Sequence, residues 1–471
     1  MDKHVVVVGG GITGLAAAYE LSKQSQSQRD AGWTFQLVEA SSRLGGEIWT
    51  EKAGDFVLEL GVDSFVTAKD SALKLCRELG LSHKLCPTLP GSGTAYVYRN
   101  GKLRALPAGM CLGVPLKIVP FMVSDLVSWP GKLRMGLEFF LRGRKDGRDE
   151  SISEFTNRRF GREALHSIVG PLIGSICAGD PDRMSLKSTL PQFFDLERRY
   201  GSLIRGLMKK AERGKRPLFE DGGPMPAVTP FMSLEGGMEE LVLALSGRIA
   251  SRCLVLGKKV LNLTKEGQEY RLELEDRTVL LAQGVLLTCP AYESARLIRS
   301  LDPSLAGELE GIPYVSTATL NLTYRLSELP VLPAGSGWVM PRSEGRFILA
   351  ATFCSQKFPG RSPSDHALLR CFVGGTGMEE RVFLKDGEVL GNVRKDLNEI
   401  LGIRSAPEMV RIHRWPKGIP QYLVGHERRL VRIRESLSAH PGLHLAGAGY
   451  DGIGLPDCIQ SGVESARAFI P

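Results

Sequence analysis

The chain has 471 residues, a length that corresponds to about three domains. Its hydrophobic fraction of 43% and charged fraction of 24% are those of a soluble globular protein and exclude a disordered, collagen-like or integral-membrane chain. The 60 basic and 52 acidic residues leave a net charge of +8. Because no long run of Lys and Arg and no nucleic-acid motif accompanies this excess, we expect no nucleic-acid partner.

Cysteine usage indicates a reducing compartment. The 9 Cys are scattered and form no C-x-x-C pair, which is typical of free thiols in a cytosolic protein and not of a disulfide framework or a zinc site. His440 and His444 have helical spacing, but Pro441 and Gly442 lie between them. We therefore expect no protein-bound metal.

The N-terminal residues run straight into an apolar strand, without the layout of a signal peptide. The most apolar long segment, Ala105–Trp129, is interrupted by Lys117, Asp125 and three prolines, so it is not a transmembrane helix. Two interpretations stay open, a buried helical subdomain and short helices that lie on a membrane surface. We expect a cytoplasmic protein, with peripheral membrane contact as the second possibility.

The first elements are predicted in immediate succession. Val5–Val8 is a β-branched run suited to a buried strand, Gly9–Gly14 follows it, and Leu15–Leu21 has good helix propensity. A polar loop over residues 24–32 then leads to a second strand at Phe35–Val38. This order predicts a βαβ unit and a parallel sheet.

The middle of the chain reads as mostly helical, and the later part returns to an α/β pattern. From Leu73 to Arg159 the exception is a hairpin over Tyr96–Leu103 that turns at Asn-Gly. We expect a charged, exposed loop over Arg142–Glu150 and a Gly- and Pro-rich loop over Ala211–Pro230. The later predicted elements are helices over Glu239–Ile249 and Pro456–Phe469 and strands over Lys259–Leu263, Thr319–Tyr324, Phe347–Ala350, Leu368–Phe372 and Leu443–Ala446.

The pattern Gly9-x-Gly11-x-x-Gly14 has a direct physical interpretation. The first glycine permits a tight turn, the second lets the backbone approach a pyrophosphate, and the third lets the helix pack closely on the strand. Glu39, at the end of the second strand, is placed to accept hydrogen bonds from a ribose and disfavours a 2′-phosphate. The pattern predicts a dinucleotide held by Gly9, Gly10, Gly11, Ile12, Thr13, Gly14 and Glu39, and it leaves NAD and FAD open.

The residues that follow, Ala40-Ser-Ser-Arg-Leu-Gly-Gly-Glu47, resemble the second fingerprint of the flavoprotein amine-oxidase superfamily. Residues 59–65 resemble its loop against the flavin, and residues 446–457 resemble its C-terminal flavin motif, where a helix dipole would stabilise negative charge on the reduced flavin. The resemblance implies FAD as the cofactor. It adds these residues to the cofactor site: Ala40, Arg43, Gly45, Gly46, Glu47, Gly61, Val62, Asp63, Ser64, Val260, Trp415, Gly447, Ile453, Gly454 and Leu455.

Within this superfamily the chain resembles the porphyrinogen oxidases, and most of all their soluble Gram-positive form. The similar segments are Pro171–Asp180, Leu186–Phe193, Leu234–Met238 and parts of 415–426 and 457–462. The resemblance implies oxidation of coproporphyrinogen III to coproporphyrin III by FAD and O2, with H2O2 release, in haem biosynthesis, and a possible hand-off to the next enzyme of that pathway. The alternatives are a protoporphyrinogen IX oxidase, an amine oxidase or carotenoid desaturase, and a non-catalytic carrier of flavin or porphyrin.

The resemblance also suggests residues near the substrate. Animal protoporphyrinogen oxidases carry an Arg on the hairpin strand for a propionate, where this chain has Ala95 beside Tyr96, so we favour coproporphyrinogen. Lys69 is a candidate for a propionate or a plain surface lysine. Gly174 and Ser175 would admit a flat macrocycle or mark a helix contact. No catalytic side chain is expected, because the flavin carries the chemistry.

The predicted fold is α/β, with a discontinuous Rossmann-like FAD-binding domain, an inserted mixed α+β substrate domain and a mostly helical subdomain that could face a membrane. The expected boundaries are 1–68, 228–291 and 424–471 for the FAD-binding domain, 69–80, 182–227 and 292–423 for the substrate domain, and 81–181 for the helical subdomain.

Overall fold

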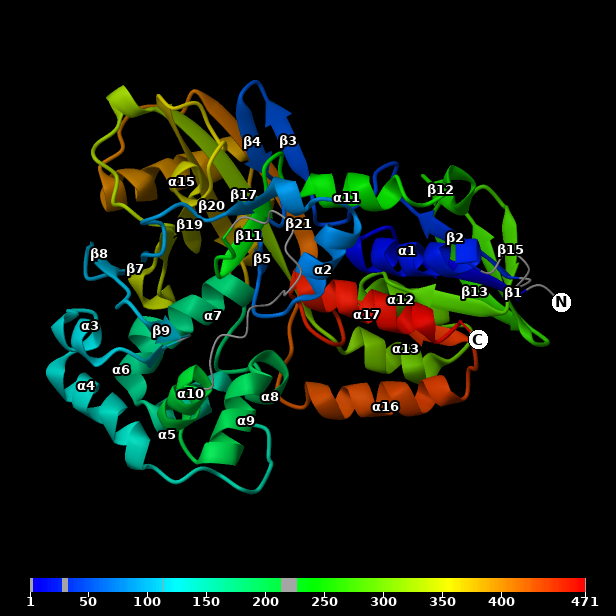
Figure 1. Ribbon diagram of the computed structural model, residues 1–471, viewed down its shortest axis with the longest axis horizontal. Helices are drawn as coiled ribbons and strands as arrows, with labels where there is room; N and C mark the ends of the chain where they lie inside the picture. Colours follow the sequence, from blue (N-terminus) through cyan, green and yellow to red (C-terminus); the bar gives the residue numbers. More distant parts are fainter. Residues whose placement is uncertain (1–2, 28–32, 112, 213–226, 471) are drawn as a thin grey trace.

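A parallel sheet of five strands, in the order β12–β2–β1–β16–β22, lies in the right half of Figure 1. The computed structural model describes residues 3–27, 33–111, 113–212 and 227–470. The sheet draws on distant parts of the chain: β1 (Lys3–Val8), β2 (Trp33–Glu39), β12 (Leu254–Leu256), β16 (Gly284–Leu287) and β22 (Leu443–Leu445). Since β1 pairs in parallel with β2 and a helix connects them, the predicted βαβ unit is confirmed.

Both faces of this sheet are covered, which explains the four successive valines of β1. Val5 and Val7 pack on one face among four helices, and Val6 and Val8 pack on the other against a small antiparallel sheet and three helices. The first group comprises α1 (Ile12–Ser27), α2 (Ser71–Glu78), α11 (Glu239–Ser246) and α17 (Leu455–Arg467). The second comprises β13 (Val260–Glu266), β14 (Glu269–Leu274), β15 (Val279–Ala282), α12 (Ala291–Ile298), α13 (Pro303–Glu310) and α16 (His426–Ser438).

A mixed sheet of seven strands, in the order β21–β17–β20–β19–β18–β7–β8, forms the second layered part. Its strands are β7 (Ala95–Arg99), β8 (Lys102–Ala105), β17 (Tyr314–Arg325), β18 (Gly337–Val339), β19 (Ala350–Phe353), β20 (His366–Gly374) and β21 (Met409–Pro420). The predicted hairpin is confirmed, because β7 and β8 meet at Asn100 and Gly101 with φ angles of 51° and 76°. Helix α15 (Asp386–Leu401) packs on this sheet through its apolar face.

The chain between β8 and β11 (Phe231–Leu234) is mostly helical and lies at the lower left of Figure 1. Its helices are α3 (Ile118–Val123), α4 (Trp129–Gly136), the 3₁₀ turn η2 (Leu137–Phe140), α5 (Ile152–Arg159), α6 (Arg162–Ala164), α7 (Gly170–Cys177), α8 (Leu186–Thr189), α9 (Pro191–Tyr200) and α10 (Leu203–Glu212). The α-helices among them share one apolar core. Nowhere in the described ranges does a helix have the length and apolarity needed to cross a membrane.

Small sheets join these parts. They are formed by β3 (Thr50–Ala53) with β4 (Phe56–Glu59), by β9 (Met110–Cys111) with β10 (Val114–Pro115), and by β11 with β5 (Phe65–Val66) and β6 (Leu85–Pro87). A short helix, α14 (Cys354–Lys357), follows β19. Helices α12 and α13 fall within the range predicted for the substrate domain, yet they share a core with the parallel sheet.

Two predicted elements differ from the structure in their bounds. The loop over 24–32 is wrong at its start, because α1 continues to Ser27; residues 28–32 lie outside the described ranges. The strand predicted over Phe347–Ala350 begins later, since β19 starts only at Ala350. The reason is that the backbone N–H groups of Phe347 and Ile348 donate to the Asp396 carboxylate, at 2.7 and 2.9 Å. These two donors are thereby unavailable to a sheet ladder.

The predicted loops also need correction. The loop over Arg142–Glu150 is not simply exposed, since Glu150 is buried and accepts hydrogen bonds from Arg144 and Arg158. The loop over Ala211–Pro230 starts later than expected, because α10 runs to Glu212, and its residues 213–226 lie outside the described part of the chain.

Candidate functional site

A cavity of about 490 Å³ opens at the carboxyl ends of β1, β2 and β16. Val8, Val38 and Thr288 mark those strand ends in its wall. Tyr314 of β17 and Cys458 of α17 contribute the opposite side. A crevice at this edge of an open parallel sheet is where α/β proteins bind nucleotides.

The three glycines of the Gly9-x-Gly11-x-x-Gly14 pattern have different surroundings. Gly9 has a φ of 111°, in the region that favours glycine. A Cβ on Gly14 would lie 1.9 Å from the Gly9 carbonyl oxygen, so helix α1 can lie against β1 only with glycine there. A Cβ on Gly11 would meet nothing within 4 Å, because this position faces the cavity. The space beside Gly11 and the N-terminus of α1 fits a pyrophosphate.

The Glu39 carboxylate is held at the cavity edge by the backbone. Its two oxygens accept hydrogen bonds from Gly10 N–H at 2.6 Å and Ser41 N–H at 2.8 Å. Gly45 N–H donates to the Gly10 carbonyl oxygen at 2.8 Å, which places the second glycine pair beside the first loop. Arg43 braces this turn, because its guanidinium donates to the carbonyl oxygen of Ile48 at 2.7 Å and lies over the Trp49 ring.

Most of the predicted cofactor residues line this one cavity. They are Gly9, Gly11, Ile12, Thr13, Glu39, Ala40, Gly45, Gly46, Glu47, Val62, Val260, Ile453 and Leu455. The remaining nine do not line it and lie in the surrounding layer: Gly10, Gly14, Arg43, Gly61, Asp63, Ser64, Trp415, Gly447 and Gly454.

The residues of that layer fix the shape of the cavity. A Cβ on Gly61 would lie 1.7 Å from the Glu47 carbonyl oxygen, and Trp415 Nε1–H donates to the Leu60 carbonyl oxygen at 2.8 Å. Gly447 N–H donates to Ser461 Oγ at 3.2 Å. The first two contacts hold Leu60 and Gly61 against Trp415 and Glu47, and the third ties the start of the C-terminal motif to α17.

Asp63 and Ser64 turn away from the cavity toward a cation pair. Lys357 Nζ lies 2.8 Å from the Asp63 carboxylate, Ser64 Oγ–H donates to it at 2.7 Å, and Arg370 lies 4.0 Å away. These neighbours, with Lys357 the strongest, outweigh desolvation and hold the pKa of Asp63 well below its usual range. The pair fastens the loop after β4 to α14 and β20.

Sequence reasoning missed several residues of the wall. They are Val8, Val38, Ile48, Lys258, Lys259, Thr288, Cys289, Pro290, Glu293, Arg296, Leu297, Tyr314, Gly418, Ala448, Gly449 and Cys458. Some stood beside residues already singled out, such as Lys259 before Val260 and Ala448 after Gly447. Others carry no local signal, because only the register of β17 and β21 brings Tyr314 and Gly418 to this place.

The four candidate substrate residues lie outside this cavity wall. Lys69 forms an ion pair with Asp457, in the first turn of α17. Tyr96 O–H donates to the Ala334 carbonyl oxygen at 2.9 Å. Gly174 has open space where a Cβ would stand, and Ser175 O–H donates to the Pro171 carbonyl oxygen at 2.8 Å within α7.

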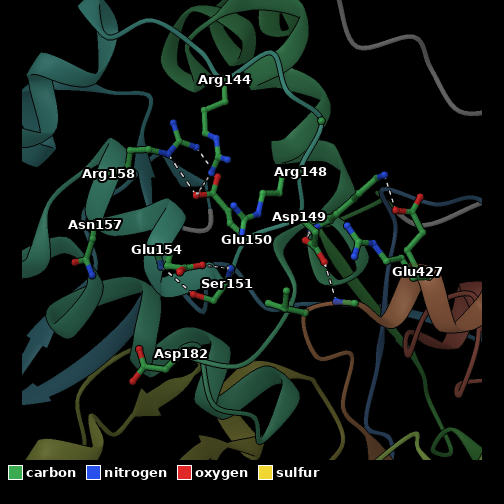
Figure 2. Close-up of a pocket in the computed structure, with 15 residues that line it drawn as sticks. Arg144, Arg148, Asp149, Glu150, Ser151, Glu154, Asn157, Arg158, Asp182 and Glu427 are labelled. Carbon is green, nitrogen blue, oxygen red and sulfur yellow. Dashed lines mark hydrogen bonds and ion pairs between the residues drawn. The ribbon is translucent and has the colours of Figure 1, made fainter.

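A second cavity, of about 1290 Å³, lies between the helical region and the start of α16. Figure 2 shows Arg144 and Arg158 directed toward Glu150 in its wall. Asp149 accepts from Ser185 O–H at 2.8 Å and from Gly425 N–H at 3.3 Å. Glu150 and Asp149 are thus paired with neighbouring protein groups. We therefore interpret this cavity as part of a charged interface between the helical region and the start of α16.

The chain is similar to known proteins over nearly its whole length. The model of the family described as flavin containing amine oxidoreductase matches residues 12–470. Coproporphyrinogen III oxidase of Bacillus subtilis is 37% identical over 98% of this chain and 96% of its own, and protoporphyrinogen oxidase of Bos taurus is 33% identical over 100% and 99%. The solved structure of a candidate protoporphyrinogen oxidase from Exiguobacterium sp. 255-15 has a TM-score of 0.85 and 32% identity, over 99% of this chain and 98% of its own.

The cofactor and the family follow together from these findings. The open space at Gly11, the carboxylate at the end of β2 and the motif at the start of α17 fit an FAD molecule lying across the sheet edge. The chain belongs to the flavin-containing amine oxidoreductase family, with FAD as its cofactor.

Proposed function

We propose that the protein oxidises coproporphyrinogen III to coproporphyrin III in haem biosynthesis, with O2 as the electron acceptor and H2O2 as its product. The observation that carries the proposal is the 37% identity to the Bacillus subtilis coproporphyrinogen III oxidase, because it extends over 98% of the chain. The similarity therefore includes the helical region and the mixed sheet as well as the cofactor site.

The protein's own residues would bind and orient two flat molecules. FAD, when bound, supplies an acceptor for hydride from a porphyrinogen carbon. The N-terminus of α17 lies at the cavity through Ile453 and Leu455, and its dipole favours negative charge there. Gly174, with open space at its Cβ position, would let a macrocycle approach α7, and Lys69, Tyr96 and Ser175 stay proposals for the substrate side.

The test is growth of porphyrin fluorescence in air, with coproporphyrinogen III and protoporphyrinogen IX supplied in parallel. We expect faster turnover of coproporphyrinogen III, one H2O2 for each electron pair removed, and loss of the signal without FAD. Equal or reversed rates would instead make the protein a protoporphyrinogen IX oxidase, as the similarity to the bovine enzyme would allow. Tight porphyrin binding without flavin reduction would favour a carrier.

We also propose that the helical region contacts a membrane surface peripherally, where the product would pass to the next enzyme. The support is a group of apolar side chains that are at least 60% exposed: Ile118, Val119, Val123, Trp129, Leu133 and Phe140. They lie on α3, α4 and η2, at the end of the molecule far from the parallel sheet (Figure 1). Exposed apolar groups of this size mark protein or membrane contacts.

Vesicle flotation tests this second proposal. The wild type should float with anionic vesicles, and Val119→Ser combined with Phe140→Ser should remain in the soluble fraction. Val331→Ser removes another fully exposed apolar side chain, outside this group, and should float like the wild type. Equal behaviour of the double variant and the wild type would rule out this surface.

A further inference from the structure

Glu47 is a carboxylic acid placed on the wall of the FAD cavity by a rigid piece of backbone. Its carbonyl oxygen accepts a hydrogen bond from Val62 N–H at 3.0 Å. The preceding residue, Gly46, lies against the phosphate loop, since a Cβ on it would be 3.1 Å from Gly11 Cα. Glu47 is therefore fixed one residue beyond the point where the pyrophosphate loop and the second fingerprint meet.

The Glu47 carboxyl group has no hydrogen bond or ion pair with any residue that the structure describes. The surface it leaves open faces the cavity, and Oε1 lies 3.0 Å from the place that a Cβ on Gly418 would take. A polar group aimed into a cofactor cavity without a protein partner is available to the cofactor.

The titratable groups around Glu47 are uncharged near neutral pH. They are Tyr292 of α12, Tyr314 of β17 and Cys458 of α17; burial raises the pKa of all three, that of Cys458 to about 12. The Glu47 side chain is exposed to the open cavity, and the protein atoms around that cavity, with no cation among the described groups that act on it, raise the pKa of its carboxyl to about 7 through desolvation.

Most of the other charged residues of the cavity wall have protein partners, and Lys259 lines the wall beside them. Lys258 Nζ lies 2.8 Å from Asp276, Glu293 lies 2.9 Å from Arg296, and Glu39 is held by the backbone of the phosphate loop.

We propose that Glu47 binds FAD as a neutral carboxylic acid, donating a hydrogen bond to an oxygen of the cofactor's pyrophosphate–ribityl chain. An ionised carboxylate would repel the two negative charges of the pyrophosphate, whereas the protonated form supplies a donor. FAD binding is then coupled to proton uptake.

The sign of the pH dependence follows from linkage. Below about pH 7 Glu47 is protonated in the free protein and in the complex, so the affinity for FAD does not depend on its titration. Above that pH the free protein loses the proton and the complex must take it up. The Kd for FAD therefore rises with pH, by up to about tenfold per pH unit.

The experiment is a titration of the apoprotein with FAD, followed by flavin fluorescence, at intervals from about pH 6 to about pH 8.5. For the wild type we expect a flat Kd up to neutrality and a rise above it. Glu47→Gln keeps a donor at every pH, so its Kd should stay flat and be lower than the wild-type Kd at the alkaline end. Glu310→Gln removes a paired carboxylate on α13, outside the cavity wall, and it should keep the wild-type slope.

A second measurement needs no variant. Calorimetry of FAD binding in two buffers of different ionisation enthalpy should show uptake of close to one proton per FAD above neutrality, and close to none below it. A pH-independent wild-type Kd, a slope that persists in Glu47→Gln, or weaker binding by a folded Glu47→Gln at every pH would each overturn the proposal. The inference rests on FAD binding alone, so the outcome of the porphyrinogen assay does not affect it.

Discussion

At the scale of single residues, Gly11 is the position where a side chain and the cofactor compete for the same space. A Cβ there meets no protein atom within 4 Å and the position lines the cavity, so the space beside it is open to the cofactor. We predict that Gly11→Asp abolishes FAD binding, because it adds both bulk and negative charge beside the pyrophosphate.

The ratio of absorbance at 450 nm to that at 280 nm after purification measures bound flavin. Gly391→Asp is a matched control, since Gly391 lies exposed on α15 with nothing within 4 Å of its Cβ position. A yellow Gly11→Asp protein with full flavin content would contradict the assignment of the phosphate loop.

Asp63 illustrates a residue whose role differs from the expected one. Its partners Lys357 and Arg370 have side chains only 13% and 3% exposed, so removal of the carboxylate would leave two enclosed cations without their counterion. We predict that Asp63→Asn lowers the free energy of unfolding by about 3 kcal/mol. Urea unfolding of the wild type and the variant measures this difference, and an unchanged midpoint would show that the pair does not stabilise the fold.

At the scale of elements, one buried carboxylate organises the helical region. Glu138 of η2 is fully buried, forms an ion pair with the buried Arg159 of α5, and accepts hydrogen bonds from Ser202 O–H at 2.7 Å and Leu203 N–H at 2.8 Å at the start of α10. The Glu138 side chain thus connects η2 with α5 and with the start of α10.

We predict that Glu138→Ala destabilises this region by about 3 kcal/mol, because it removes the main counterion of the buried Arg159 guanidinium and leaves only Glu197, at 3.5 Å. Amide hydrogen exchange should speed up in α5, α9 and α10 and stay unchanged in α1. Uniform exchange across the molecule would mean that the helical region does not open as a separate unit.

At the start of α16, the buried His426 makes the stability of the fold depend on pH. His426 is buried and stacks on the Tyr422 ring at 4.2 Å, and desolvation lowers the pKa of His426 to about 4. Tyr422 O–H in turn donates to the Ala448 carbonyl oxygen and accepts from Gly452 N–H, both within the C-terminal flavin motif.

Because the unfolded histidine takes up a proton near pH 6.5 and the folded one only near 4, stability is lost progressively as the pH falls between these values. We predict that the melting temperature of the wild type falls over this interval more steeply than that of His426→Phe, which has no proton to gain. Parallel pH profiles of the two proteins would exclude His426 as the cause.

At the scale of the whole molecule, prediction from sequence succeeded where the signal was local. The βαβ start rests on Val5–Val8 and the adjacent glycines, and the β7–β8 hairpin rests on Asn100-Gly101. Each signal lies within the element that it predicts, so no tertiary contact is needed to interpret it.

Prediction failed where a distant residue decided the local structure. Asp396 of α15 takes the backbone donors of Phe347 and Ile348, so the expected strand begins later. Tyr314 and Gly418 enter the cavity wall through strand register, which a single sequence does not encode in any motif. The ion-pair partners of Asp63, Lys357 and Arg370, lie about 300 positions further along the chain, so no local signal in the sequence indicates them.

The cavity wall is assembled from segments that begin at Val8 and end at Cys458. A growing chain on the ribosome would therefore expose the glycine loop well before β22 and α17 are made. When the first βαβ unit has been made, the wall residues contributed by β13, α12, β17 and α17 do not yet exist. The complete FAD site therefore requires the chain to have been made at least as far as α17.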